Sequence, residues 1–175
     1  MGEAGNKQPM LVRMLRHRWL DESHTRKAIP PDVAERLAQR VAASEQRHTG
    51  EIRLYVEAGL PTAYLWRHAT PRERAVAMFG ELRVWDTEHN NGVLIYLLLA
   101  ERAIEIVADR GLDRQVAPDE WRAIVARMSA AFREGRFEDG LTQAIAEVTA
   151  QLAMHFPAAA GDSNPNELPD APVLG

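Results

Sequence analysis

The sequence contains no cysteine. This absence excludes disulfide frameworks, thiolate zinc sites and thiol nucleophiles, and it fits a reducing compartment. Long apolar runs are also missing, since the longest, Gly92 to Ala100, is far shorter than the roughly 20 residues that span a bilayer. The first residues show no apolar segment typical of a secretion signal. We therefore expect a soluble, cytoplasmic protein that does not span a membrane.

Several common catalytic and nucleotide-binding patterns are absent as well. The chain has neither a G-x-x-x-x-G-K-[ST] loop nor a G-x-G-x-x-G loop, so nothing indicates a glycine loop that binds nucleotide phosphates. None of the serines stands in a G-x-S-x-G turn, and no two histidines have the H-E-x-x-H spacing. The net charge of −4 argues against nucleic acid as a partner, because neutralising phosphates needs a dominant basic face.

The composition is that of an ordinary globular protein. With 175 residues, of which 46% are hydrophobic and 26% charged, the chain can bury one core. We expect one domain over residues 31–156, preceded by a partly helical extension, residues 1–30. The tail, residues 157–175, has too few apolar residues to offset its ordering entropy and is predicted to be disordered.

Apolar residues at helical spacing predict the helices. The extension contains "LVRMLRHRWL", a short amphipathic helix whose arginines either stay in solvent or contact an anionic membrane surface. Within the domain, Pro31 favours the start of one helix, and Thr70 with Glu73 forms the capping box of another. Two further amphipathic helices are predicted within residues 117–135 and 137–156.

Three strands are predicted between these helices. Residues 51–57 alternate strictly between apolar and polar, which is typical of a half-exposed strand. Gly92 to Ala100 is apolar on both faces, which indicates a central strand, and residues 102–109 should form an antiparallel hairpin with it. The order of elements predicts a three-layer α/β/α sandwich around a small mixed sheet of three or four strands.

An acidic, amide-rich loop precedes the central strand, and a second acidic group follows the hairpin. If the hairpin pairs as predicted, both groups meet at one edge of the sheet. Carboxylate and amide oxygens are the ligands that Ca²⁺ and, with stricter geometry, Mg²⁺ prefer. The sequence predicts a metal site there, with turn formation as the alternative role of the same residues. The predicted ligands are Asp86, Glu88, Asn90, Asn91, Asp109 and Asp113.

Phosphoester chemistry would use the same edge. It needs a general acid, for which His89 is a candidate, and cationic groups for the phosphoryl oxygens, for which Arg110 and Arg114 are candidates. Asp86 or Asp113 would then act as acid, base or nucleophile.

Three stretches carry a family resemblance: "TGEIRLYVE", "NNGVLIYLLLAERAIEIVADRGLD" and "FREGRFEDGLTQAI". Together they resemble the TPM domain family, which includes bacterial and thylakoid-lumen members. The resemblance implies an α/β/α sandwich, with calcium binding in some members and phosphatase activity in some. Asn90 stands where the family usually has Asp, and this loss of a carboxylate should weaken a divalent site.

Two functions therefore stand as hypotheses. The first is a calcium-binding interaction module of a bacterial protein, with a protein partner in the maintenance of membrane proteins, as the resemblance implies. The alternative is a weak metal-dependent or acid phosphatase that acts on phosphoesters.

Overall fold

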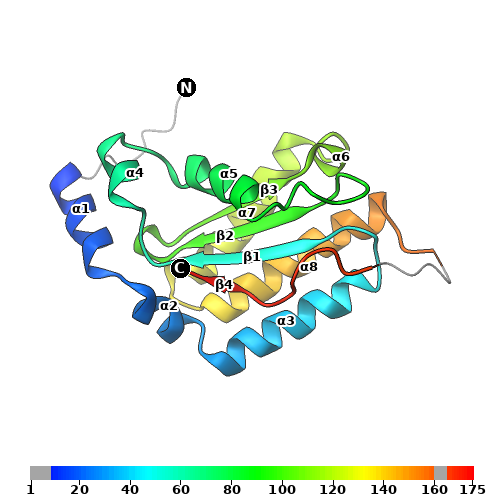
Figure 1. Cartoon of the computed structure of the whole chain (residues 1–175), viewed down its shortest axis with the longest axis horizontal. Coiled ribbons are helices and arrows are strands. Elements are labelled where there is room, and N and C mark those ends of the chain that lie inside the picture. Colours follow the sequence, from blue (N-terminus) through cyan, green and yellow to red (C-terminus); the bar gives the residue numbers. More distant parts are fainter. Residues whose placement is uncertain (1–8, 160–164) are drawn as a thin grey trace.

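A four-stranded mixed sheet, ordered β3-β2-β1-β4, forms the centre of the computed structural model (Figure 1). The structure describes residues 9–159 and 165–175. β1 is parallel to β2 and to β4, whereas β2 and β3 form the predicted antiparallel hairpin. The strands are β1 (Ile52–Glu57), β2 (Val93–Leu98), β3 (Ala103–Ala108) and β4 (Val173–Leu174). This mixed sheet confirms the predicted α/β class.

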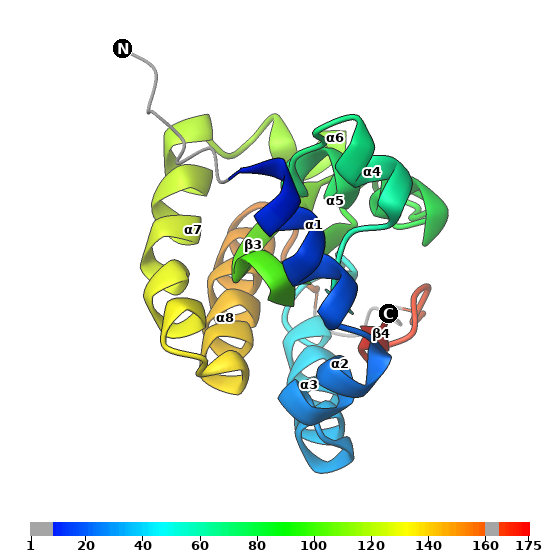
Figure 2. The same ribbon diagram turned by 90° about the vertical axis from the view of Figure 1, so that its left-hand side faces the viewer.

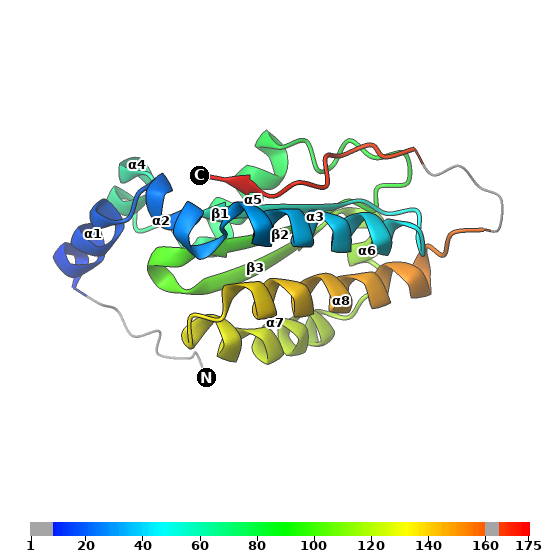
Figure 3. The ribbon, with the colours of Figure 1, turned by 90° about the horizontal axis from the view of Figure 1, so that it is seen from below.

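Helices cover both faces of this sheet (Figure 3). One side holds α3 (Pro31–Glu45), α7 (Pro118–Arg133) and α8 (Phe137–His155), and the other holds α4 (Thr62–Trp66) and α5 (Pro71–Glu81). Every side chain of β2 is fully buried, as its continuous apolar run predicts. The three layers of the predicted sandwich are therefore present.

The predicted helix starts are confirmed by local structure. Pro31 occupies the first turn of α3, where a missing N–H costs nothing. The Thr70 side chain accepts from the Glu73 backbone N–H, and the Glu73 carboxylate accepts from Thr70 N at 2.7 Å, which completes a capping box at α5.

The prediction that β1 is half-exposed is wrong. Tyr55 and Glu57, which share the supposedly polar face, are buried at 5% exposure each. The reason is that α5 covers this face and supplies Arg74, whose guanidinium binds the Glu57 carboxylate at 2.7 Å. Alternation in the sequence indicates polarity, but it does not show whether a partner buries the polar face.

The expectation of a disordered tail is wrong for residues 165–175, while residues 160–164 lie outside the described residues. Val173–Leu174 pair with the free edge of β1, and Gly175 N donates to Val56 O at 2.9 Å. Leu168 is 7% exposed. The open edge of β1 supplies backbone partners that the tail's own composition does not reveal.

At one end of the sheet, α1 (Met10–Trp19) and α2 (Glu22–Ala28) pack beside the β2–β3 turn (Figure 2). The turn is a short 3₁₀ segment, η1 (Leu99–Glu101). His17 anchors α1, because its Nδ1 accepts from Leu60 N at 2.9 Å and its Nε2 lies 3.0 Å from Glu101 Oε1. Among the described residues, none of the helices combines the length and the apolar character of a membrane span.

Candidate functional site

Three loops meet at the other end of the sheet, where β2 begins and β3 ends. Asp109 N donates to Gly92 O at 2.8 Å, and Gly111 N donates to Asn90 O at 2.9 Å. On the β1 side, Val93 N donates to Glu51 O at 2.8 Å. The structure therefore brings the end of the acidic loop next to the short helix α6 (Arg110–Asp113) that follows the hairpin.

Two glycines permit this close approach. A Cβ atom at Gly92 would collide with the carbonyl oxygen of Val84, and one at Gly111 would collide with the carbonyl oxygen of Asn90. Any larger residue would push these backbones apart. The glycines thus determine how closely the loops pack around the site.

Asn91 is fully buried beneath this contact. Its side-chain Nδ2 donates to Thr49 Oγ1 at 3.2 Å, and its backbone N donates to Thr87 Oγ1 at 3.2 Å. The remaining side-chain atom, Oδ1, is buried and accepts no hydrogen bond from the residues that the structure describes.

Asp109 is also buried, with 6% of its surface exposed. Its Oδ1 accepts from Arg110 N at 2.7 Å, whereas its Oδ2 is buried without a partner in the described part of the chain. A buried polar atom left unpaired costs about 1–3 kcal/mol, and more when it carries charge. Such an atom in a native protein needs an explanation, and a bound water or ion is one of them. Asp109 Oδ2 and Asn91 Oδ1 are therefore both buried without a hydrogen-bond donor among the described residues. The hairpin register puts Gly92 opposite Asp109, so the side chains of Asn91 and Asp109 leave the hairpin on opposite faces of the sheet.

The other predicted site residues lie at the surface. Exposed side chains belong to Asp86, Glu88, His89, Asn90, Arg110, Asp113 and Arg114. Within residues 9–159 and 165–175, no three His, Asp or Glu side chains gather into a group that could hold a metal, so the predicted carboxylates do not form such a cluster. A cation here would rely on amide and backbone oxygens as well as on carboxylates.

Sequence reasoning missed two acidic residues at this end. Glu167 in the tail accepts from Glu88 N at 3.2 and 3.3 Å, and the fully buried Glu51 accepts from Leu168 N at 3.2 Å. Burial raises the pKa of Glu51 to about 7, and it raises the pKa of Glu45, whose carboxylate accepts from Ile52 N, to about 8. One signal in the sequence could have indicated the burial of Glu51: it lies on the same strand face as the aromatic residue Tyr55.

A buried histidine supports the Thr49 turn. His48 Nδ1 lies 3.0 Å from Gly50 O, and its Nε2 lies 2.8 Å from Ser44 Oγ. Burial lowers the pKa of His48 to about 4, so the ring is neutral at pH 7. A neutral ring that donates from Nδ1 to the Gly50 carbonyl leaves Nε2 as the acceptor for Ser44.

Comparison with known proteins agrees with this architecture. The family model of the TPM domain matches residues 24–151. The chain is similar in structure to the NMR structure of BA42 protein from the psychrophilic bacteria Bizionia argentinensis sp. nov., with a TM-score of 0.73 and 26% sequence identity. That match covers 84% of this chain and 95% of the other. A comparison with curated proteins found no match.

Proposed function

Because this chain belongs to the TPM domain family, we propose that it is a calcium-binding interaction module with a protein partner in the maintenance of membrane proteins. The observation that carries the calcium part is Asp109 Oδ2, which is buried without a hydrogen-bond donor among the described residues and belongs to the residue that pairs with Gly92 at the end of the acidic loop. The role in membrane-protein maintenance is supported by the family resemblance.

The chemistry of these atoms fits a hard cation. Asp109 would hold the ion, and the loop that carries Asp86 and Glu88 would supply further oxygens. Calcium accepts six to eight oxygen ligands in flexible geometry, whereas magnesium demands a near-ideal octahedron. An irregular loop of mixed amide and carboxylate oxygens therefore favours calcium. When bound, the ion would supply positive charge that offsets the burial of the Asp109 carboxylate.

A partner protein would contact this loop through its exposed side chains. Trp85 opens the loop and is 50% exposed, and aromatic residues are enriched where proteins contact one another. An ion that orders residues 86–91 would also fix the position of this indole. The proposed link between calcium and partner binding is thus the loop itself.

Thermal unfolding with and without calcium tests the proposal. At a hundredfold excess over Kd, an ion that binds only the folded state adds about 2.7 kcal/mol. Asp109→Asn removes the negative charge but keeps the shape of the side chain and an oxygen that accepts from Arg110 N. It should therefore lose most of that gain. Asp119→Asn, an exposed acid on α7, is the matched control and should keep the gain. Constant ionic strength prevents screening from imitating binding.

A phosphoester assay on the same proteins addresses the alternative. The proposal expects no turnover above that of a protein-free blank. Turnover that Asp109→Asn abolishes and Asp119→Asn preserves would instead establish the phosphatase hypothesis. Absence of any calcium-dependent shift in melting temperature would refute the metal site.

A further inference from the structure

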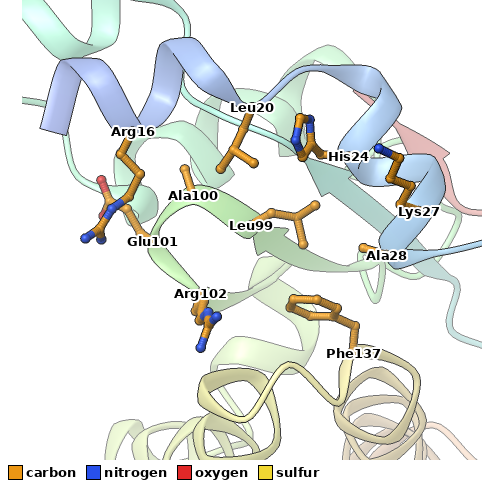
Figure 4. Close-up of a pocket in the computed structure, with 10 residues that line it drawn as sticks. All are labelled: Arg16, Leu20, His24, Lys27, Ala28, Leu99, Ala100, Glu101, Arg102 and Phe137. Carbon is orange, nitrogen blue, oxygen red and sulfur yellow. The ribbon is translucent and has the colours of Figure 1, made fainter.

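A pocket lies at the opposite end of the sheet from the candidate metal site, between the β2–β3 turn and the first two helices (Figure 4). Its volume is about 730 Å³, which is within the range of small-molecule sites. We propose that this pocket binds the phosphate-bearing headgroup of an anionic membrane lipid while α1 lies on the membrane surface. The lining residues are Arg16, Leu20, His24, Lys27, Ala28, Leu99, Ala100, Glu101, Arg102 and Phe137.

The charge of the lining fits an anion. Arg16, Lys27 and Arg102 come from α1, α2 and the hairpin turn, on different sides of the pocket (Figure 4). Within residues 9–159 and 165–175, neither Arg16 nor Lys27 makes an ion pair or a side-chain hydrogen bond, so both cations remain available. The acidic residue of the lining, Glu101, already binds Arg13 Nε at 2.7 Å. The net charge available to a ligand is therefore positive.

The remainder of the lining is apolar. Leu20, Leu99 and Phe137 lie between the cationic side chains, together with two alanines (Figure 4). A small hydrated anion gains nothing from such a surface, whereas the glycerol and first acyl carbons behind a lipid phosphate bury apolar area there. The combination favours an amphiphilic anion over free phosphate.

The helix beside the pocket exposes a second apolar surface. Leu11, Leu15 and Trp19 recur at every fourth position of α1 and are 70%, 49% and 77% exposed. Arg13 and His17, on the opposite face, hold the helix to Glu101. An exposed apolar stripe beside arginines is typical of helices that lie in the membrane interface, where tryptophan is also favoured.

The charge distribution along the chain supports the same orientation. Residues 10–28 contain five Arg or Lys and two Asp or Glu, although the whole chain has 21 basic and 25 acidic residues. This segment would face the negative surface of a membrane and direct the acidic remainder away from it. Of this surface, α1 precedes the residues matched by the TPM domain, whereas Lys27 lies within them.

Co-sedimentation of the full chain with lipid vesicles tests the proposal. Binding is expected to vesicles of phosphatidylcholine mixed with phosphatidylglycerol and not to phosphatidylcholine alone. Each basic residue near an anionic surface contributes roughly fivefold in affinity, so Arg16→Gln with Lys27→Gln should weaken binding roughly 25-fold. The control pair, Arg47→Gln with Arg122→Gln, changes the net charge equally on exposed positions far from the pocket and should stay within about twofold.

Two further experiments distinguish the contribution of the pocket from that of the α1 surface, and lipid binding from the binding of free phosphate. Leu15→Ser with Trp19→Ser should weaken vesicle binding without lowering the melting temperature, because both side chains are exposed. Inorganic phosphate at matched ionic strength should compete poorly. The proposal is overturned if phosphatidylglycerol vesicles do not bind, if the pocket and control pairs weaken binding equally, or if free phosphate binds and the vesicles do not.

Discussion

The buried ion pair between α5 and β1 gives the sharpest prediction about the fold. Arg74 Nη2 lies 2.7 Å from Glu57 Oε1, Arg74 Nε lies 3.0 Å from Glu57 Oε2, and Tyr96 Oη donates to Glu57 Oε2 at 2.7 Å. Arg74 is 8% exposed and Glu57 is 5% exposed. Replacing Arg74 by Leu would leave the Glu57 carboxylate buried without its cation.

The magnitude follows from this burial. Removing one partner of a buried pair costs about 3–5 kcal/mol, against a total stability of roughly 5–15 kcal/mol. For a chain of this length each kcal/mol corresponds to roughly 2–4 °C, so the melting temperature of Arg74→Leu should fall by roughly 6–20 °C. Removing both charges, in Arg74→Leu with Glu57→Leu, should recover much of this loss, because no unpaired charge remains.

Thermal and urea unfolding of the single and double variants measure this directly. Arg127→Leu, which removes an exposed pair with Glu147, is the control and should have a much smaller effect. A single variant as stable as the parent protein, or a double variant no more stable than the single, would refute the claim that the carboxylate is buried and paired.

Two more predictions concern the tail and the buried acids beneath it. Leu168→Ala should destabilise the protein by about 2 kcal/mol in urea unfolding, because this side chain is buried, and an unchanged midpoint would show that the tail is not docked. The folded protein retains the Glu45 proton up to about pH 8, whereas the unfolded chain releases it near pH 4.5, so stability should fall as pH rises between these values. Glu45→Gln should therefore gain a few kcal/mol on the parent protein at pH 9 and little at pH 4, whereas an equal difference at both pH values would contradict the raised pKa.

Local signals in the sequence determined most of the fold. The proline at position 31, the Thr70–Glu73 capping box and the apolar run of β2 each act within a few residues, so their consequences could be predicted. The burial of Glu57 could not, because its partner Arg74 is 17 residues away and belongs to a different element. The docked tail depends on the edge of β1, which lies over 100 residues earlier.

For the candidate site, the sequence predicted which backbone segments lie close together but not which side chains are buried. Hairpin pairing alone placed Asn91 near Asp109 at one end of the sheet. Which side chains are buried depends on how closely Gly92 and Gly111 let the backbones approach, and no spacing rule gives that. Glu167 was missed because its role depends on the docking of the tail.

The central claim is that calcium binds at Asp109 beside the acidic loop, and an NMR titration of the backbone amides tests it most directly. Calcium added at constant ionic strength should shift the amides of residues 86–92 and 109–111 together, along one saturable curve, and Asp109→Asn should abolish that curve while Asp119→Asn preserves it. Shifts that are absent, that do not saturate, or that persist unchanged in Asp109→Asn would contradict the claim.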